Sequence, residues 1–73
     1  MIEVRLFATL RQGREKIYSF PAEEYKTAGE LLKKRDIPEK DVAILLINGF
    51  HSKPDAAVRD GDVVSFFPPV AGG

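Results

Sequence analysis

Apolar and polar side chains alternate along residues 2–9, a pattern that predicts a half-buried strand. One side of this strand carries Ile2, Val4, Leu6 and Ala8, and the other carries Glu3, Arg5, Phe7 and Thr9. Phe7 is the apolar exception on the otherwise polar side.

A second strand is predicted over residues 16–20, after a connection that contains Gly13. The side chains of Ile17, Tyr18 and Phe20 favour β structure because they are β-branched or aromatic. Pro21 cannot donate a ladder hydrogen bond, so it ends this strand.

Thr27 and Glu30 have the spacing of a capping box, which predicts a helix from Ala28. Leu31 and Leu32 give this helix an apolar stripe, and the basic residues 33–35 suit the negative end of its dipole. A helix of about three turns depends on packing against a sheet for its stability.

Residues 42–47 are all apolar, which predicts a buried strand leading into a tight hairpin at Asn48-Gly49. Residues 50–52 would form the short return strand. Asp60-Gly61-Asp62 then indicates a turn, and residues 63–67 predict the last strand.

The predicted order is two strands, one helix and three strands. This order favours an α+β domain with the helix packed across one face of a mixed sheet of four to five strands. In a β-grasp arrangement, the first and last strands lie parallel at the sheet centre. Both strands would then contribute to the core face, through Ile2, Val4, Leu6, Val64 and Phe66. Phe7 and Phe67 fall on the opposite face by parity, where they would form an apolar patch of the kind that partners bind.

Composition narrows the function classes. The 73 residues allow one small domain over residues 1–73, and 11 basic residues balance 11 acidic ones, which argues against nucleic-acid binding. The absence of cysteine excludes disulfides, thiol catalysis and cysteine metal sites. No apolar run approaches the roughly 20 residues that span a bilayer, and no signal peptide is evident. We therefore expect a cytoplasmic protein without membrane attachment.

The sequence closes on Ala71-Gly72-Gly73, shortly after Pro68 and Pro69. Glycine has no side chain to anchor it, so the double glycine predicts a thin, flexible tail. The two prolines favour an extended backbone that projects this tail away from the sheet. Such a tail would fit a narrow channel in another protein and deliver its terminal carboxylate to a buried site.

With these features the chain resembles the MoaD/ThiS sulfur-carrier family of ubiquitin-like β-grasp proteins. The resemblance covers nearly the whole chain and rests on Leu6-Phe7-Ala8, Ile47-Asn48-Gly49, Asp60-Gly61-Asp62-Val63 and the segment from Phe66 to Gly73. The Phe-Phe-Pro-Pro segment is more similar to the molybdopterin synthase small subunit than to the thiamine-pathway carrier, which usually lacks the two prolines.

The resemblance implies a sulfur carrier rather than an enzyme. An E1-like adenylyltransferase (MoaB/MoeB/ThiF-type) would use ATP to adenylate the Gly73 carboxylate, and sulfur would replace the adenylate to give a thiocarboxylate. The tail would then enter the molybdopterin synthase large subunit and pass its sulfur to a pterin precursor. Gly73 would carry the chemistry, Gly72 and Ala71 would give clearance in the channel, and the partner contacts would come from Phe7, Phe67, Pro68 and Pro69. The chain itself would bind no cofactor and no metal, and it would be a monomer when alone.

Three alternatives stay open. A thiamine-thiazole sulfur carrier would share the Gly-Gly tail, and residues 37–58 fit that type equally well. A ubiquitin-like protein modifier would use the same adenylation to join Gly73 to lysines of other proteins. A plain interaction module would have an inert tail, and its behaviour would not change when Gly72 and Gly73 are removed.

Overall fold

The structure, a computed structural model, describes residues 1–69. The predicted sites Ala71, Gly72 and Gly73 lie outside the described residues. Five strands, one α-helix and two 3₁₀ helices follow one another along the chain: β1 (Ile2–Leu6), η1 (Ala8–Arg11), β2 (Ile17–Phe20), α1 (Ala28–Lys34), η2 (Glu39–Asp41), β3 (Ile44–Ile47), β4 (Phe50–His51) and β5 (Val63–Phe67).

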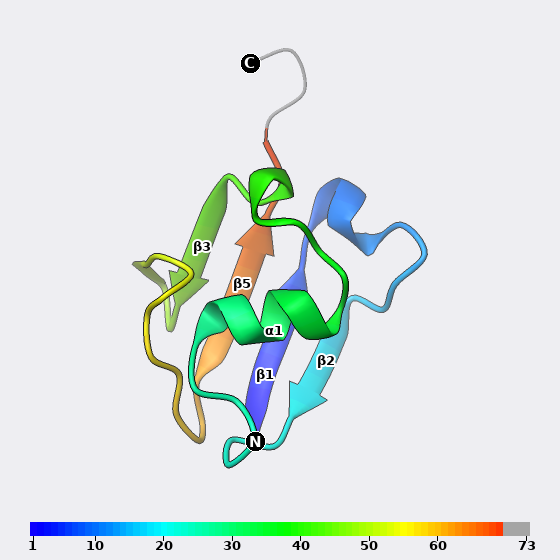
Figure 1. Ribbon diagram of the computed structural model, residues 1–73. Helices are drawn as coiled ribbons and strands as arrows, with labels where there is room; N and C mark the ends of the chain where they lie inside the picture. Colours follow the sequence, from blue (N-terminus) through cyan, green and yellow to red (C-terminus); the bar gives the residue numbers. More distant parts are fainter. Residues whose placement is uncertain (70–73) are drawn as a thin grey trace.

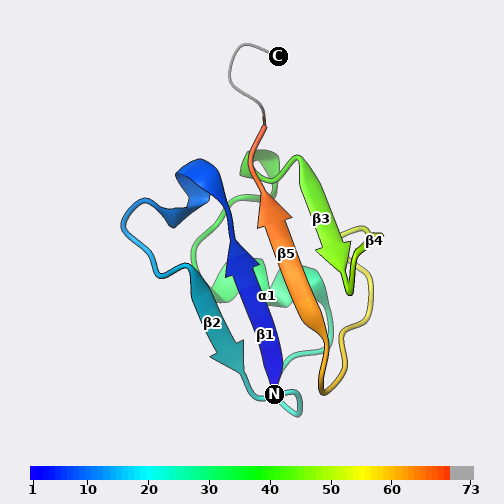
Figure 2. The ribbon, with the colours of Figure 1, turned by 180° about the vertical axis from the view of Figure 1, so that it is seen from behind.

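The strands form one mixed sheet in the order β2-β1-β5-β3-β4. β1 and β5 pair in parallel at the centre, and the other neighbours pair antiparallel. α1 lies across one face of this sheet (Figure 1), and the view from behind shows the other face uncovered (Figure 2). We call this uncovered side the open face. The α+β class, the β-grasp arrangement and the central parallel pair are therefore confirmed.

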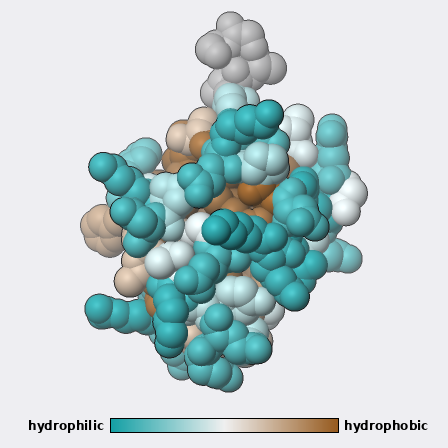
Figure 3. All heavy atoms as spheres, in the orientation of Figure 1, coloured by the Kyte–Doolittle hydropathy of each residue, from teal (hydrophilic) through white to brown (hydrophobic). Residues whose placement is uncertain are grey.

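The core lies between α1 and the sheet. The two central strands contribute the buried side chains that parity predicts, which are Ile2, Val4, Leu6, Val64 and Phe66. Ala28, Leu31 and Leu32 close the core from the helix. Charged and polar side chains cover much of the helix side, with apolar atoms visible between them (Figure 3). Burial of these apolar side chains supplies most of the stability that so short a helix lacks on its own.

The helix begins as its capping box predicts. The Thr27 hydroxyl accepts a hydrogen bond from the Glu30 amide at 3.4 Å, and the Glu30 carboxylate accepts one from the Lys26 amide at 2.8 Å. The helix has seven residues, about two turns instead of the expected three. It ends because Asp36 takes a left-handed backbone with φ of 54°.

Two predicted strands are shorter in the structure. β1 ends at Leu6 rather than at residue 9, because Ala8 takes φ of 52° and turns the chain into η1. β3 begins at Ile44, after η2, and it is not buried on both faces: Leu45 is buried, whereas Ile44 is 38% exposed on the open face. A sheet covered by one helix on one side hides only alternate residues of each strand.

The hairpin between β3 and β4 follows the prediction. Asn48 and Gly49 have φ of 52° and 85°, the left-handed values that a two-residue hairpin turn requires. Phe50 and His51 form the return strand and pair with Ile47 and Leu46.

Candidate functional site

Phe7 and Phe67 stack on each other on the open face, at the end of β5 from which the tail departs. Their ring centroids are 4.3 Å apart and the ring planes differ by 10°. Phe67 is the last residue of β5, and the Phe7 amide donates to the Phe66 carbonyl at 3.2 Å, which extends the β1–β5 pairing by one residue. We call these two residues the aromatic pair. The pair is half-buried because each ring covers one face of the other.

Arg11 covers part of the Phe7 ring. Its guanidinium carbon lies 5.3 Å from the ring centroid, and its Nε donates to the Leu6 carbonyl at 2.7 Å. The turn at Ala8 makes this contact possible, because it folds η1 back over the end of β1. A cation held over an aromatic face gives the patch a positively charged rim.

Ile44 extends the apolar surface on the other side of the aromatic pair. It lies directly opposite Phe67 in the β3–β5 register, and the Ala43 amide donates to the Phe67 carbonyl at 2.8 Å. Residues paired in this way on one sheet face place their side chains in contact range. The patch therefore runs from Phe7 through Phe67 to Ile44, across three strands.

Pro68 and Pro69 follow β5 immediately. Pro68 is half-buried and Pro69 is exposed. Both line a hollow of about 330 Å³ that also touches Thr9, Leu10, Gln12, Arg14 and Asp41. The start of the tail is thus bordered by the apolar patch on one side and by a polar hollow on the other.

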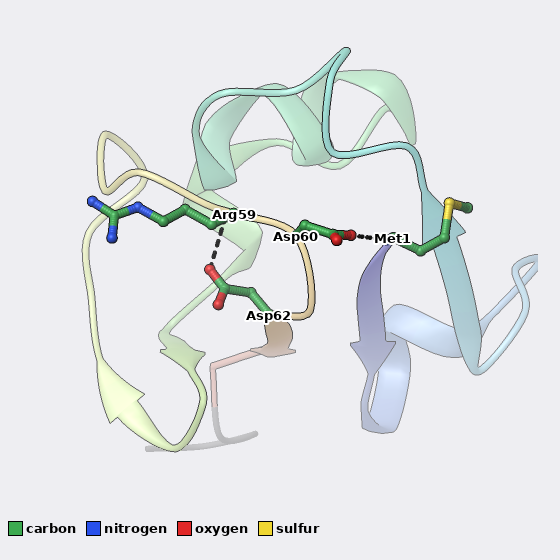
Figure 4. A network of polar contacts seen from close by, with 4 residues as sticks. All are labelled: Met1, Arg59, Asp60 and Asp62. Carbon is green, nitrogen blue, oxygen red and sulfur yellow. Dashed lines mark hydrogen bonds and ion pairs between the residues drawn. The ribbon is translucent and has the colours of Figure 1, made fainter.

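The Asp60-Gly61-Asp62 turn lies at the opposite end of β5 and has a structural role. Gly61 has φ of 88°, and the Asp62 carboxylate accepts from the Arg59 amide at 2.8 Å. Asp60 forms an ion pair with the Met1 amino group (Figure 4). The hydrogen bond and the positive charge of that amino group lower the pKa of the Asp60 carboxyl below its usual 3.8.

Asn48 ties the β3–β4 hairpin to this turn. Its side-chain amide donates to Asp62 at 2.9 Å and accepts from the Val63 amide at 2.9 Å. These bonds fix the position of β5 relative to β3, and through it the position of Phe67.

Residues 1–69 contain no group of three or more histidine and acidic side chains placed to hold a metal ion. Within the same range, no helix has the length and apolar character needed to cross a membrane. The chemistry-bearing positions Gly72 and Gly73 lie outside this range, so the described part of the site is a surface for contact.

The structure brings together four of the predicted site residues, Phe7, Phe67, Pro68 and Pro69. Sequence reasoning missed Arg11 and Ile44. Arg11 was taken as part of a solvated basic cluster, and Ile44 as part of a buried strand. Parity with Phe67 across the antiparallel β3–β5 pair is the signal that points to Ile44.

Comparison with known protein families decides the affiliation. Residues 4–73 match the ThiS family. The chain belongs to this family.

Similar proteins include small modifiers and a pterin-pathway subunit. Small archaeal modifier protein 3 of Haloferax volcanii is 33% identical over 91 residues, an alignment that covers 99% of this chain and 98% of that protein. The crystal structure of SAMP1 from Haloferax volcanii has a TM-score of 0.72 at 26% identity and covers 99% and 98% of the two chains. A Pyrococcus furiosus protein assigned as molybdopterin converting factor subunit 1 has a TM-score of 0.64 at 27% identity and covers 94% and 97%.

This ThiS-family chain is therefore a small ubiquitin-like protein of the sulfur-carrier and modifier class. Small carriers of this kind are not catalytic themselves.

Proposed function

We propose that this ThiS-family chain is a sulfur carrier whose Gly73 carboxylate becomes a thiocarboxylate and donates sulfur for molybdopterin synthesis. The observation that carries the proposal is the family match, which extends to residue 73 and so includes the Gly-Gly segment. The similarity to the Pyrococcus furiosus protein supports molybdopterin as the destination of the sulfur.

The chemistry needs two steps on the Gly73 carboxylate. One carboxylate oxygen attacks the α-phosphate of ATP, which forms the acyl-adenylate and releases pyrophosphate. Hydrosulfide then attacks the carbonyl carbon, and AMP leaves with the former carboxylate oxygen. Activation is needed because a free carboxylate is a poor acyl acceptor for nucleophiles. An E1-like adenylyltransferase supplies the catalytic groups and holds the ATP, so the chain itself needs no cofactor.

The aromatic pair and Ile44 form the surface that would dock on the partners. An apolar centre with a cationic rim at Arg11 has the make-up of a transient protein interface. The tail starts at Pro68, beside this surface, so docking would direct Ala71, Gly72 and Gly73 toward the partner's active site. The same surface would serve in turn the E1-like enzyme and the large subunit of molybdopterin synthase.

Removal of Gly72 and Gly73 tests the proposal. Incubation of the full chain with an E1-like partner and ATP should support exchange of labelled pyrophosphate into ATP. The truncated chain should support none, although it should still bind the partner through the patch. Phe67→Ala serves as the matched variant, because it keeps the tail and should weaken binding. Equal exchange by the full and truncated chains would refute the carrier role of Gly73.

A protein modifier is the second candidate function, because two of the similar proteins are small archaeal modifiers. It shares the adenylation step and differs in the acceptor, which would be a lysine amine of another protein. Tagged chain recovered from cells under denaturing conditions would then carry isopeptide-linked proteins of higher mass. A thiamine-thiazole carrier is separated by genetic rescue, since it would restore thiazole synthesis and not molybdopterin synthesis.

A further inference from the structure

The outer edge of β2 presents unpaired backbone groups. β2 is the first strand in the sheet order and has β1 as its one neighbour (Figure 1, Figure 2). The Leu6 amide donates to the Lys16 carbonyl at 2.8 Å, and this bond sets the phase of the antiparallel ladder. In such a ladder the hydrogen-bonding groups of alternate residues point to opposite sides. The amides and carbonyls of Tyr18 and Phe20 therefore face β1, while those of Ile17 and Ser19 face outward.

This edge lacks the usual protection against pairing with another strand. Natural edge strands are often blocked by a proline, a bulge or a charged side chain in the strand. β2 has none of these between its first and last residues, and Ile17 is 54% exposed on the open face. The available window is short, because Pro21 closes it at one end.

Charges at the two ends of β2 have opposite signs. Lys16 precedes the strand, and Glu23 and Glu24 follow it. All three are exposed, and none takes part in an ion pair within residues 1–69. In an antiparallel pair related by two-fold symmetry, the start of one strand lies against the end of the other. The edge is therefore complementary in charge to a second copy of itself.

We propose that two copies of this chain associate through their β2 strands, antiparallel and with Ile17 of each copy opposite Ser19 of the other. The outward amides and carbonyls of these residues would form four hydrogen bonds across the junction. The two Ile17 side chains would lie diagonally on the open face, where they would pack together. Each Lys16 would face the acidic segment of the other copy.

The contact is short, so the dimer is weak and forms at high protein concentration. A monomer is the expected state in dilute solution. The aromatic pair lies on the central strands, away from this edge, so both copies keep the docking surface free. The inference therefore stands independently of the proposed function.

Sedimentation velocity over a concentration series tests the association, and hydrogen exchange on the same samples locates it. We expect a concentration-dependent dimer in which the amides of Ile17 and Ser19 gain protection. Lys16→Glu should weaken association about tenfold, because it replaces two attractive charge contacts by repulsive ones. Glu23→Lys combined with Glu24→Lys should weaken it similarly, and the triple variant should restore it. Lys53→Glu is the control, since it makes the same charge change in a loop outside β2.

Ser19→Pro removes one outward donor without changing any charge, and it should abolish the dimer while the monomer stays folded. A chain that stays monomeric at every concentration would overturn the proposal. So would a dimer that Lys16→Glu leaves unchanged, or one whose protected amides lie outside β2.

Discussion

Phe66 and Phe67 are neighbours in β5 that face opposite sides of the sheet, so alanine at each position separates core from surface. Phe66 has an exposed fraction of 0%, and Phe66→Ala should lower the free energy of unfolding by about 3–5 kcal/mol. Phe67 is half-buried and stacked on Phe7. Its truncation forfeits roughly half of the burial term and the stacking contact, so Phe67→Ala should cost about 1–2 kcal/mol.

Urea unfolding followed by far-UV circular dichroism measures both losses, read at a constant slope against denaturant. A loss of about 3–5 kcal/mol is a large share of the stability of a small domain. Phe66→Leu therefore provides a milder core variant if Phe66→Ala does not fold. Phe67→Ala should also weaken binding to an E1-like partner by more than it lowers stability. Equal losses of stability at the two positions would refute the parity argument and would place Phe67 in the core.

Three further substitutions test local features. Asp60→Asn should lower the free energy of unfolding at neutral pH; the ion pair with Met1 depresses the pKa of Asp60 below 3.8 in the folded state, so its stabilisation is present above that value and is lost as the pH falls through the folded pKa. Chemical unfolding of both proteins should therefore converge in acid, and a gap that persists there would contradict this cause. Thr27→Ala should cost about 1 kcal/mol in thermal or urea unfolding through loss of the helix cap, and Thr27→Ser should recover most of it. Asn48→Ala should cost about 1–2 kcal/mol, because it removes both hydrogen bonds that tie the hairpin to β5, whereas an unchanged unfolding midpoint would show that these bonds contribute nothing.

Much of the fold was predictable because its strands and helix carry local signals. Alternation in β1, the capping box at Thr27 and the Asn48-Gly49 turn each specify one element, and the parity of β1 and β5 identifies the core face. The end of β1 was not predictable, because an alanine at φ of 52° is a tertiary feature that alternation does not reveal. The apolar run at residues 42–47 was equally misleading, since periodicity cannot show that one sheet face stays uncovered.

The candidate site was predictable in part for the same reason. Phe7 and Phe67 share a parity on adjacent strands, so their proximity followed from the pairing of β1 with β5. Arg11 reaches the Phe7 ring through the fold of η1, which no local pattern indicates. Ile44 joins the patch through the β3–β5 register, which depends on long-range pairing rather than on the sequence around it.

The intact mass of the full chain tests the central claim most directly. The chain is incubated with an E1-like partner, ATP and sulfide, and the products are measured before and after digestion. The account predicts a mass gain equal to the exchange of one oxygen for one sulfur, located in the peptide that ends at Gly73. A chain whose mass stays unchanged in the presence of a partner that consumes ATP would contradict the sulfur-carrier function.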